Sequence, residues 1–128
     1  MHPSATLLVV EDDEPIRDLV IATVPDHWAV VAAADIETAM ALAEEHQPNL
    51  AVLDLHLPGG TGVTLCTRLR GRFGTGLHIA MLTADPTEDA RRDAIAAGAD
   101  AFLTKPFSPV KLIELLETWS RHRREPVR

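Results

Sequence analysis

Residues 6–13 read TLLVVEDD, a short run of apolar side chains that ends abruptly in acidic ones. Four further short runs are apolar in the same way, at residues 28–33, 51–53, 78–82 and 101–103. Runs that are apolar on both faces suit strands covered by helices on both sides, as in a parallel sheet. The five runs therefore predict the strands of a parallel β-sheet.

The segments between these runs show signals for helices. In the first segment a stripe with i, i+3, i+4 spacing begins at Ile16 and includes Leu19 and Val20. The other helices are marked by a cap, an apolar stripe or an early proline: Asp35, Leu65 with Cys66 and Leu69, Pro86 with Thr87, and Ser108 with Pro109. Strands and helices that alternate in this way predict one α/β domain over residues 1–120, with residues 121–128 as a tail or linker.

Composition narrows the class of protein. The 128 residues suffice for one domain, and their net charge of −7 argues against direct binding of nucleic acid by this domain. The single Cys66 excludes a disulfide framework and a cysteine zinc site. No apolar run approaches the roughly 20 residues that span a bilayer, and the N-terminus lacks a signal-peptide pattern. We therefore expect a soluble cytoplasmic protein without a membrane partner.

Polar side chains stand where the apolar runs stop. Glu11 and Asp12 follow the first run and Asp54 follows the third, while Thr83 and Lys105 come at the ends of the fourth and fifth. The carboxyl ends of parallel strands lie along one edge of the sheet. In a flavodoxin-like doubly wound sheet of order 2-1-3-4-5, the first and third strands are neighbours. We therefore expect the acidic side chains to converge.

Clustered carboxylates repel one another unless one is protonated or a cation neutralises them. Oxygen ligands suit Mg²⁺ or Ca²⁺, and Mg²⁺ commonly combines one or two carboxylates with water and phosphate oxygens. A lysine and a threonine hydroxyl nearby suit a phosphate group. Each of these residues alone is more often a cap or a surface side chain. Together they predict a phosphoryl-transfer site in which an aspartate becomes the acceptor.

The chain resembles the receiver domain of bacterial two-component response regulators from residue 5 to about residue 120. Four motifs carry the resemblance: LLVVEDD at residues 7–13, LDLHLPGGTG at 53–62, MLTA at 81–84 and GADAFLTKPFSP at 98–109. Their combination is highly specific for this family. The resemblance implies a signalling domain that accepts a phosphoryl group rather than an enzyme that turns over a substrate.

The resemblance also assigns roles at the predicted site. Asp54 matches the phosphoacceptor, and Lys105 matches the phosphate-binding lysine, whose bond to the following proline is often cis. Glu11 and Asp12 match the acidic pair that binds Mg²⁺, with Asp12 the more direct ligand. The backbone carbonyl of His56 is expected to complete the protein ligands.

Thr83 matches the switch residue that moves toward the phosphoryl group, which opens space for the switch aromatic Phe102. The implied readout surface comprises the fourth helix, fifth strand and fifth helix. Because the fourth helix is rich in alanine and has Ile95 as its one large apolar residue, we hypothesise that it is weakly anchored and mobile. His56 and Asp85 depart from the residues common at their positions, and we expect them to tune the lifetime of the phosphoryl group.

The resemblance implies two kinds of partner. A sensor histidine kinase or a phosphotransfer protein would supply the phosphoryl group, and a downstream effector or output domain outside this chain would read the signal. A phosphorylation-dependent homodimer is a further expectation. However, Ala101, Lys111 and Leu115 do not clearly supply the cross-dimer ion pairs that DNA-binding relatives carry.

Two alternative functions remain open from the sequence. A phosphohydrolase of the haloacid-dehalogenase type also has an aspartate at a strand end and a lysine, but it generally needs a second aspartate where this chain has His56. A pseudo-receiver would signal without phosphorylation, and the intact acidic residues together with Thr83 and Lys105 argue against it.

Overall fold

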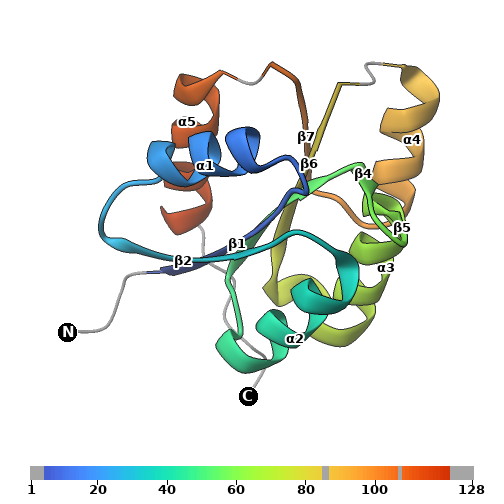
Figure 1. Ribbon diagram of the computed structural model, residues 1–128, viewed down its shortest axis with the longest axis horizontal. Helices are drawn as coiled ribbons and strands as arrows, with labels where there is room; N and C mark the ends of the chain where they lie inside the picture. The colour runs from blue at the N-terminus through green and yellow to red at the C-terminus, as the bar shows by residue number, and fades with distance from the viewer. Residues whose placement is uncertain (1–4, 85–86, 107, 122–128) are drawn as a thin grey trace.

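The computed structural model describes residues 5–84, 87–106 and 108–121, which form a parallel sheet between two layers of helices (Figure 1). The strands of the sheet are β1 (Ala5–Val10), β2 (Trp28–Ala33), β3 (Leu50–Asp54), β6 (His78–Thr83) and β7 (Ala101–Thr104). They lie in the order β2-β1-β3-β6-β7 with every pairing parallel. The prediction of a flavodoxin-like order 2-1-3-4-5 is confirmed.

Helices follow the strands in strict alternation. They are α1 (Glu14–Thr23), α2 (Ile36–His46), α3 (Gly62–Phe73), α4 (Glu88–Ala96) and α5 (Pro109–Arg121). Figure 1 shows α1 and α5 on one face of the sheet and α2, α3 and α4 on the other. None of the helices within the described ranges combines the length with the apolar composition that a bilayer crossing requires.

The helices begin where the sequence signals placed them. Asp35 caps α2 by accepting a hydrogen bond from Thr38 N at 2.8 Å, and Thr87 caps α4 by accepting one from Ala90 N at 3.2 Å. Ser108 Oγ accepts from Lys111 N at 3.3 Å at the start of α5. These side chains satisfy backbone donors that the first turn leaves without helical partners.

Alternate residues of the strands build a separate core on each face of the sheet. On β1, Leu8 and Val10 pack toward α2 and α3, whereas Leu7 and Val9 pack toward α1 and α5. All four side chains are at most 1% exposed. Because the strands are covered on both sides, their apolar residues stand at consecutive positions rather than at every second one.

Three features differ from the sequence prediction. Leu19 is part of the predicted apolar stripe of α1, yet its side chain is 53% exposed, and Val20 is the buried residue of that helix. The short hairpin of β4 (His56–Leu57) and β5 (Gly60–Thr61) and the 3₁₀ turn η1 (Gly74–Gly76) were not predicted. Elements of two or three residues are too short to show any periodicity.

The difference between Leu19 and the core leucines can be measured. Leu53 is fully buried, so Leu53→Ala should lower the free energy of unfolding by about 2–5 kcal/mol through lost burial and a new cavity. The same truncation at Leu19 should change it by no more than about 0.5 kcal/mol. Urea unfolding at equilibrium compares the two variants, and equal losses would contradict the placement of Leu19 at the surface.

Candidate functional site

The strand registers bring the predicted site residues to one edge of the sheet. Val10 of β1 pairs with Leu53 of β3. Glu11 and Asp54 come one residue later in the chain, so they follow two residues that are neighbours in the sheet. They point into the same region because residues at equal register on paired parallel strands share a face. The expected convergence of these acidic residues therefore follows from a single pairing.

The register extends the site across the next two strands. Asp54 pairs with Leu82 of β6, so Thr83 lies one position beyond it. Thr83 pairs with Thr104 at the end of β7, so Lys105 lies one position beyond that pair. Lys105 N donates to the Thr83 carbonyl at 2.7 Å, and the Lys105–Pro106 peptide bond is cis, as the resemblance implied.

The acidic side chains and Lys105 form one cluster. Glu11, Asp12 and Asp54 each offer a carboxylate oxygen, and these oxygens lie within 4.8 Å of one another. Glu11 and Asp54 are only 1% and 4% exposed, whereas Asp12 is exposed at the mouth of the site. Lys105 Nζ lies 2.9 Å from Glu11 Oε2 and 3.2 Å from Asp54 Oδ1. One ammonium group thus bridges two buried carboxylates.

Burial and proximity perturb these groups. Burial raises the pKa of the Glu11 carboxyl above its ordinary value, and the charge of Asp54 raises it further against the opposing effect of Lys105. Burial acting alone would lower the pKa of Lys105, but its hydrogen bonds and attraction to Glu11 and Asp54 outweigh that effect and raise it. Lys105 is therefore a firmly held cation, while Glu11 binds a proton more readily than an exposed glutamate does.

Backbone N–H groups hold the carboxylates in place. Glu11 Oε1 accepts from Asp13 N at 3.2 Å. Asp54 Oδ1 accepts from His56 N at 3.4 Å. These contacts leave the carboxylates oriented before any ligand arrives, which lowers the cost of binding one.

The remaining predicted residues have distinct surroundings. Thr83 is fully buried, and His56 is exposed on β4, two residues after Asp54. Phe102 pairs with Met81, two positions before Thr83 and Thr104, and is half-buried with the Arg91 guanidinium 6.0 Å from its ring centre. Asp85 lies outside the described residues.

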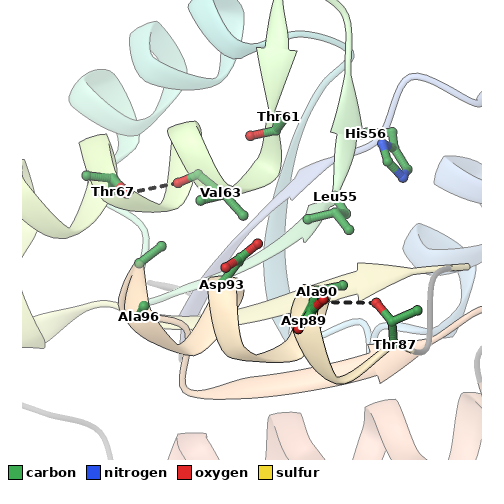
Figure 2. A pocket seen from close by; sticks show the side chains of 11 residues that line it. Leu55, His56, Thr61, Val63, Thr67, Thr87, Asp89, Ala90, Asp93 and Ala96 are labelled. Atoms are coloured by element: carbon green, nitrogen blue, oxygen red, sulfur yellow. Dashed lines mark hydrogen bonds between the residues drawn. The ribbon is translucent and has the colours of Figure 1, made fainter.

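A groove with a volume of about 660 Å³ separates α3 from α4 next to this site (Figure 2). Leu55, Val63 and Ala90 contribute apolar surface to it, and the carboxylates of Asp89 and Asp93 line it from α4. His56, two residues after Asp54, also lines the groove. Asp89, Asp93 and Ala96 of α4 therefore border this groove, while Ala90 and Ala94 of the same helix are buried in the core.

The donor set fits a hard divalent cation. Three carboxylates on two adjacent strand ends supply only oxygen ligands, which suit Mg²⁺ or Ca²⁺ and not zinc. Asp12 is accessible from solvent, so a cation has a path to the buried oxygens of Glu11 and Asp54. The cluster could hold one metal ion.

The sheet order and this acidic edge define a flavodoxin-like α/β protein with a cation-binding site at the carboxyl ends of its strands. The chain belongs to the response regulator receiver domain family, which its residues 7–117 match. Members of this family are signalling domains of two-component systems.

Curated relatives are full regulators of transcription. The chain is 36% identical over 114 residues to the phosphate regulon transcriptional regulatory protein PhoB of Pseudomonas aeruginosa, covering 88% of this chain and 50% of that protein. It is 39% identical over 121 residues to the alkaline phosphatase synthesis transcriptional regulatory protein SphR of Synechococcus elongatus, covering 87% and 47%. The chain spans about half the length of the curated relatives it matches.

Solved structures give the same fold. The chemotaxis response regulator CheY4 of Vibrio cholerae superposes with a TM-score of 0.81 at 30% identity, covering 89% of this chain and 97% of that one. A CheY-like response regulator receiver domain protein of Methanospirillum hungatei superposes with a TM-score of 0.86 at 27% identity, covering 93% and 95%.

Gly62 is a site residue that the sequence prediction missed. It begins α3, its backbone N–H donates to the Leu55 carbonyl at 2.7 Å, and its missing side chain leaves room for the Asp54 backbone. A Cβ atom at this position would stand 2.3 Å from the Asp54 carbonyl oxygen and 2.8 Å from Met81 Sδ. The sequence alone gives no sign of this close contact between Gly62 and Asp54. The contact depends on the distance between α3 and β3, which only the folded structure shows.

Two glycines of the same helix provide a matched test. Gly62→Ala should lower the free energy of unfolding by about 1–3 kcal/mol, because the new methyl group must displace the strand that carries Asp54. A Cβ at Gly71 meets nothing within 4 Å, so Gly71→Ala should raise it by about 0.5–1 kcal/mol through helix propensity. Urea unfolding of both variants measures the contrast, and a neutral Gly62→Ala would contradict this packing.

Proposed function

We propose that this chain receives a phosphoryl group on Asp54 from a phosphohistidine in a Mg²⁺-dependent reaction. The observation that carries the proposal is the position of Lys105, whose ammonium group contacts both Asp54 and Glu11 inside a cluster of oxygen ligands. Glu11, Asp12 and Asp54 are the proposed side-chain ligands of the ion, and the His56 carbonyl is the fourth. When bound, Mg²⁺ would neutralise charge on the carboxylates and on the incoming phosphoryl oxygens.

Asp54 is the nucleophile of the proposed reaction. One of its carboxylate oxygens attacks the phosphorus in line, an O–P bond forms, and the P–N bond to the donor imidazole breaks. The imidazole leaves with the bonding electron pair and takes up a proton from water. Lys105 stays within reach of the Asp54 carboxylate and pairs with the new phosphoryl charge, so no separate acid or base is needed.

The proposed response uses residues beside the acceptor. The Thr83 hydroxyl lies at the end of the strand next to Asp54 and would hydrogen-bond the phosphoryl group, which frees space for Phe102 on the adjacent strand. Face α4-β7-α5 would carry the changed surface. His56 lies two residues after Asp54 and Asp85 lies two residues after Thr83, and we propose that they tune how long the phosphoryl group persists.

The proposed partners follow from the same chemistry. A histidine kinase or phosphotransfer protein supplies the phosphoryl group in the cytoplasm, and an effector or output domain reads the domain formed by residues 1–120, with residues 121–128 as tail or linker. The PhoB and SphR relatives are transcriptional regulators about twice as long as the segment that matches this chain. This difference in length supports an output domain outside this chain. Phosphorylation-dependent pairing of two copies is part of the proposal.

A phosphohydrolase of the haloacid-dehalogenase type is disfavoured because His56 stands where its acid–base aspartate is needed.

Intact mass spectrometry tests the acceptor. Incubation with acetyl phosphate and Mg²⁺ should add about 80 Da to the wild type and to Asp93→Asn, a control that removes an exposed carboxylate elsewhere. Asp54→Asn should gain no adduct, because its amide is not a nucleophile, and EDTA should suppress the wild-type adduct. An unmodified wild type, or an adduct of equal yield on Asp54→Asn, would contradict the proposal.

A further inference from the structure

Asp12 carries the exposed carboxylate of the acidic cluster. The described residues form no hydrogen bond or ion pair with this carboxylate. The buried carboxylates of Glu11 and Asp54, by contrast, are held by Lys105 Nζ at 2.9 and 3.2 Å. The position of the Asp12 carboxylate therefore depends on how the backbone of Asp12 is held.

Arg17 donates to the carbonyl groups of the residues before and after Asp12. Its side chain reaches back from α1, and Nη1 donates to the Glu11 carbonyl at 3.0 Å. Its backbone N–H donates to the Asp13 carbonyl at 2.9 Å at the start of the helix. One residue therefore closes the turn between β1 and α1 around Asp12.

Three further contacts hold the same turn. Glu11 N donates to the Ala33 carbonyl at 3.0 Å, and Asp13 N donates to Glu11 Oε1 at 3.2 Å. Asp13 Oδ1 accepts from Ile16 N at 3.2 Å and thereby caps α1. The Arg17 contact differs from these because it joins a side chain inside the helix to the backbone at the end of the strand. It therefore fixes the first turns of α1 relative to β1.

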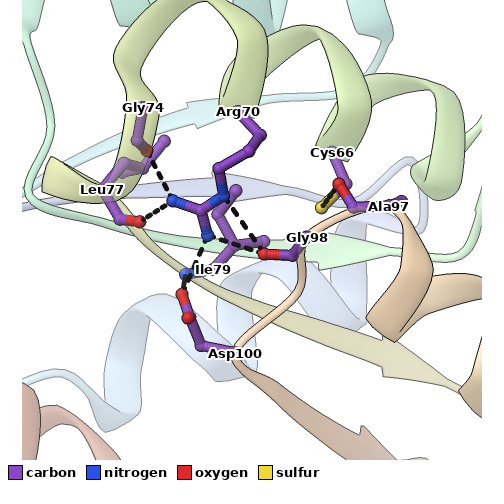
Figure 3. Close-up of polar contacts among 8 residues, drawn as sticks. All are labelled: Cys66, Arg70, Gly74, Leu77, Ile79, Ala97, Gly98 and Asp100. Carbon is purple, nitrogen blue, oxygen red and sulfur yellow. Dashed lines mark hydrogen bonds and ion pairs between the residues drawn. The ribbon is translucent and has the colours of Figure 1, made fainter.

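Arg70 of α3 shows how an arginine that ties segments together away from the site differs from Arg17 (Figure 3). All five N–H donors of Arg70 are used. Their acceptors lie in the turns that follow α3 and α4 and are the carbonyls of Gly74, Leu77 and Gly98 and the Asp100 carboxylate. None of these acceptors is next to a residue of the acidic cluster. The Arg17 contact, in contrast, is made to the backbone of a cluster residue.

We propose that Arg17 is a positioning residue of the cation site. By holding the Glu11 carbonyl, it keeps the backbone of Asp12 in the conformation that brings three carboxylates together. Without this contact, Asp12 would have to be ordered when the cation binds, which lowers affinity. The effect on the cation rests on the proposed function, whereas the effect of Arg17 on the turn does not.

The positive charge of Arg17 acts in the opposite direction. A guanidinium near the site repels a divalent cation, so loss of the charge alone would tighten cation binding. Arg17 is half-buried, and between partly exposed charges this effect is about fivefold or less. Loss of a contact that orients metal ligands typically weakens binding about 10- to 100-fold. Positioning therefore outweighs repulsion, and the sign of the change in affinity separates the two.

Titration with MgCl₂, followed by the amide NMR shifts of Leu55 and His56, measures the affinity. Arg17→Met should raise the dissociation constant for Mg²⁺ about tenfold or more. Arg17→Lys should stay within about threefold of the wild type, because an ammonium group can still donate to one carbonyl. If Arg17→Met does not fold, Arg17→Gln takes its place, because its amide nitrogen stops short of the Nη1 position. Unchanged or tighter binding in the variant would overturn the positioning role.

Two controls separate positioning from charge and from general stability. Arg72→Met removes a positive charge that pairs with Glu44 on the surface, and Val20→Ala weakens the packing of α1 without touching Glu11. Both should leave the dissociation constant within about twofold of the wild type. A loss in Val20→Ala equal to that in Arg17→Met would overturn the specific role of Arg17.

Hydrogen exchange without added cation tests the turn by itself. Arg17→Met should speed exchange of the Asp13 N–H about tenfold, because its acceptor Glu11 Oε1 belongs to the turn that is released, while exchange at Val9 stays unchanged. Unchanged exchange at Asp13 would overturn the positioning role. If the wild type binds no Mg²⁺, the proposed function fails at its cation, and the exchange result still decides whether Arg17 holds the turn.

Discussion

The position of Lys105 between Glu11 and Asp54 is the interaction on which the rest of the structure depends. Burial of two carboxylates is costly unless a cation and hydrogen bonds compensate for the lost water. Lys105 provides that cation at 2.9 and 3.2 Å, and backbone N–H groups supply the hydrogen bonds. The contacts of Lys105 require β1, β3 and β7 to end at the same level along the sheet. The register of the strands therefore places the charges, and the attraction between the charges in turn favours that register.

The two edges of the sheet serve different purposes. At the carboxyl edge, charged side chains are held close together with an opening to solvent at Asp12, which suits binding and exchange of a ligand. At the opposite edge, Arg70 has all its donors satisfied by neighbouring segments.

Much of the fold and the candidate site could be predicted from the sequence because the signals are local. Apolar runs that stop at Glu11, Asp54 and Thr83 give the strands and their ends, and a parallel sheet then brings those ends together. The outward direction of Leu19 was not predictable, since a stripe at helical spacing does not show how wide the buried face is. Arg70 and Gly62 were also missed, because their contacts join segments distant in sequence and leave no periodic pattern.

The most direct test of the Lys105 bridge is a carbon-13 NMR titration of the Glu11 carboxyl group. The account predicts a pKa for Glu11 above its ordinary value in the wild type, because burial disfavours its charge, and a higher one in Lys105→Met, which loses the compensating cation. Lys111→Met, which removes an exposed lysine, should leave the titration unchanged. An unchanged Glu11 titration in Lys105→Met, or equal effects of the two lysine variants, would contradict the bridge.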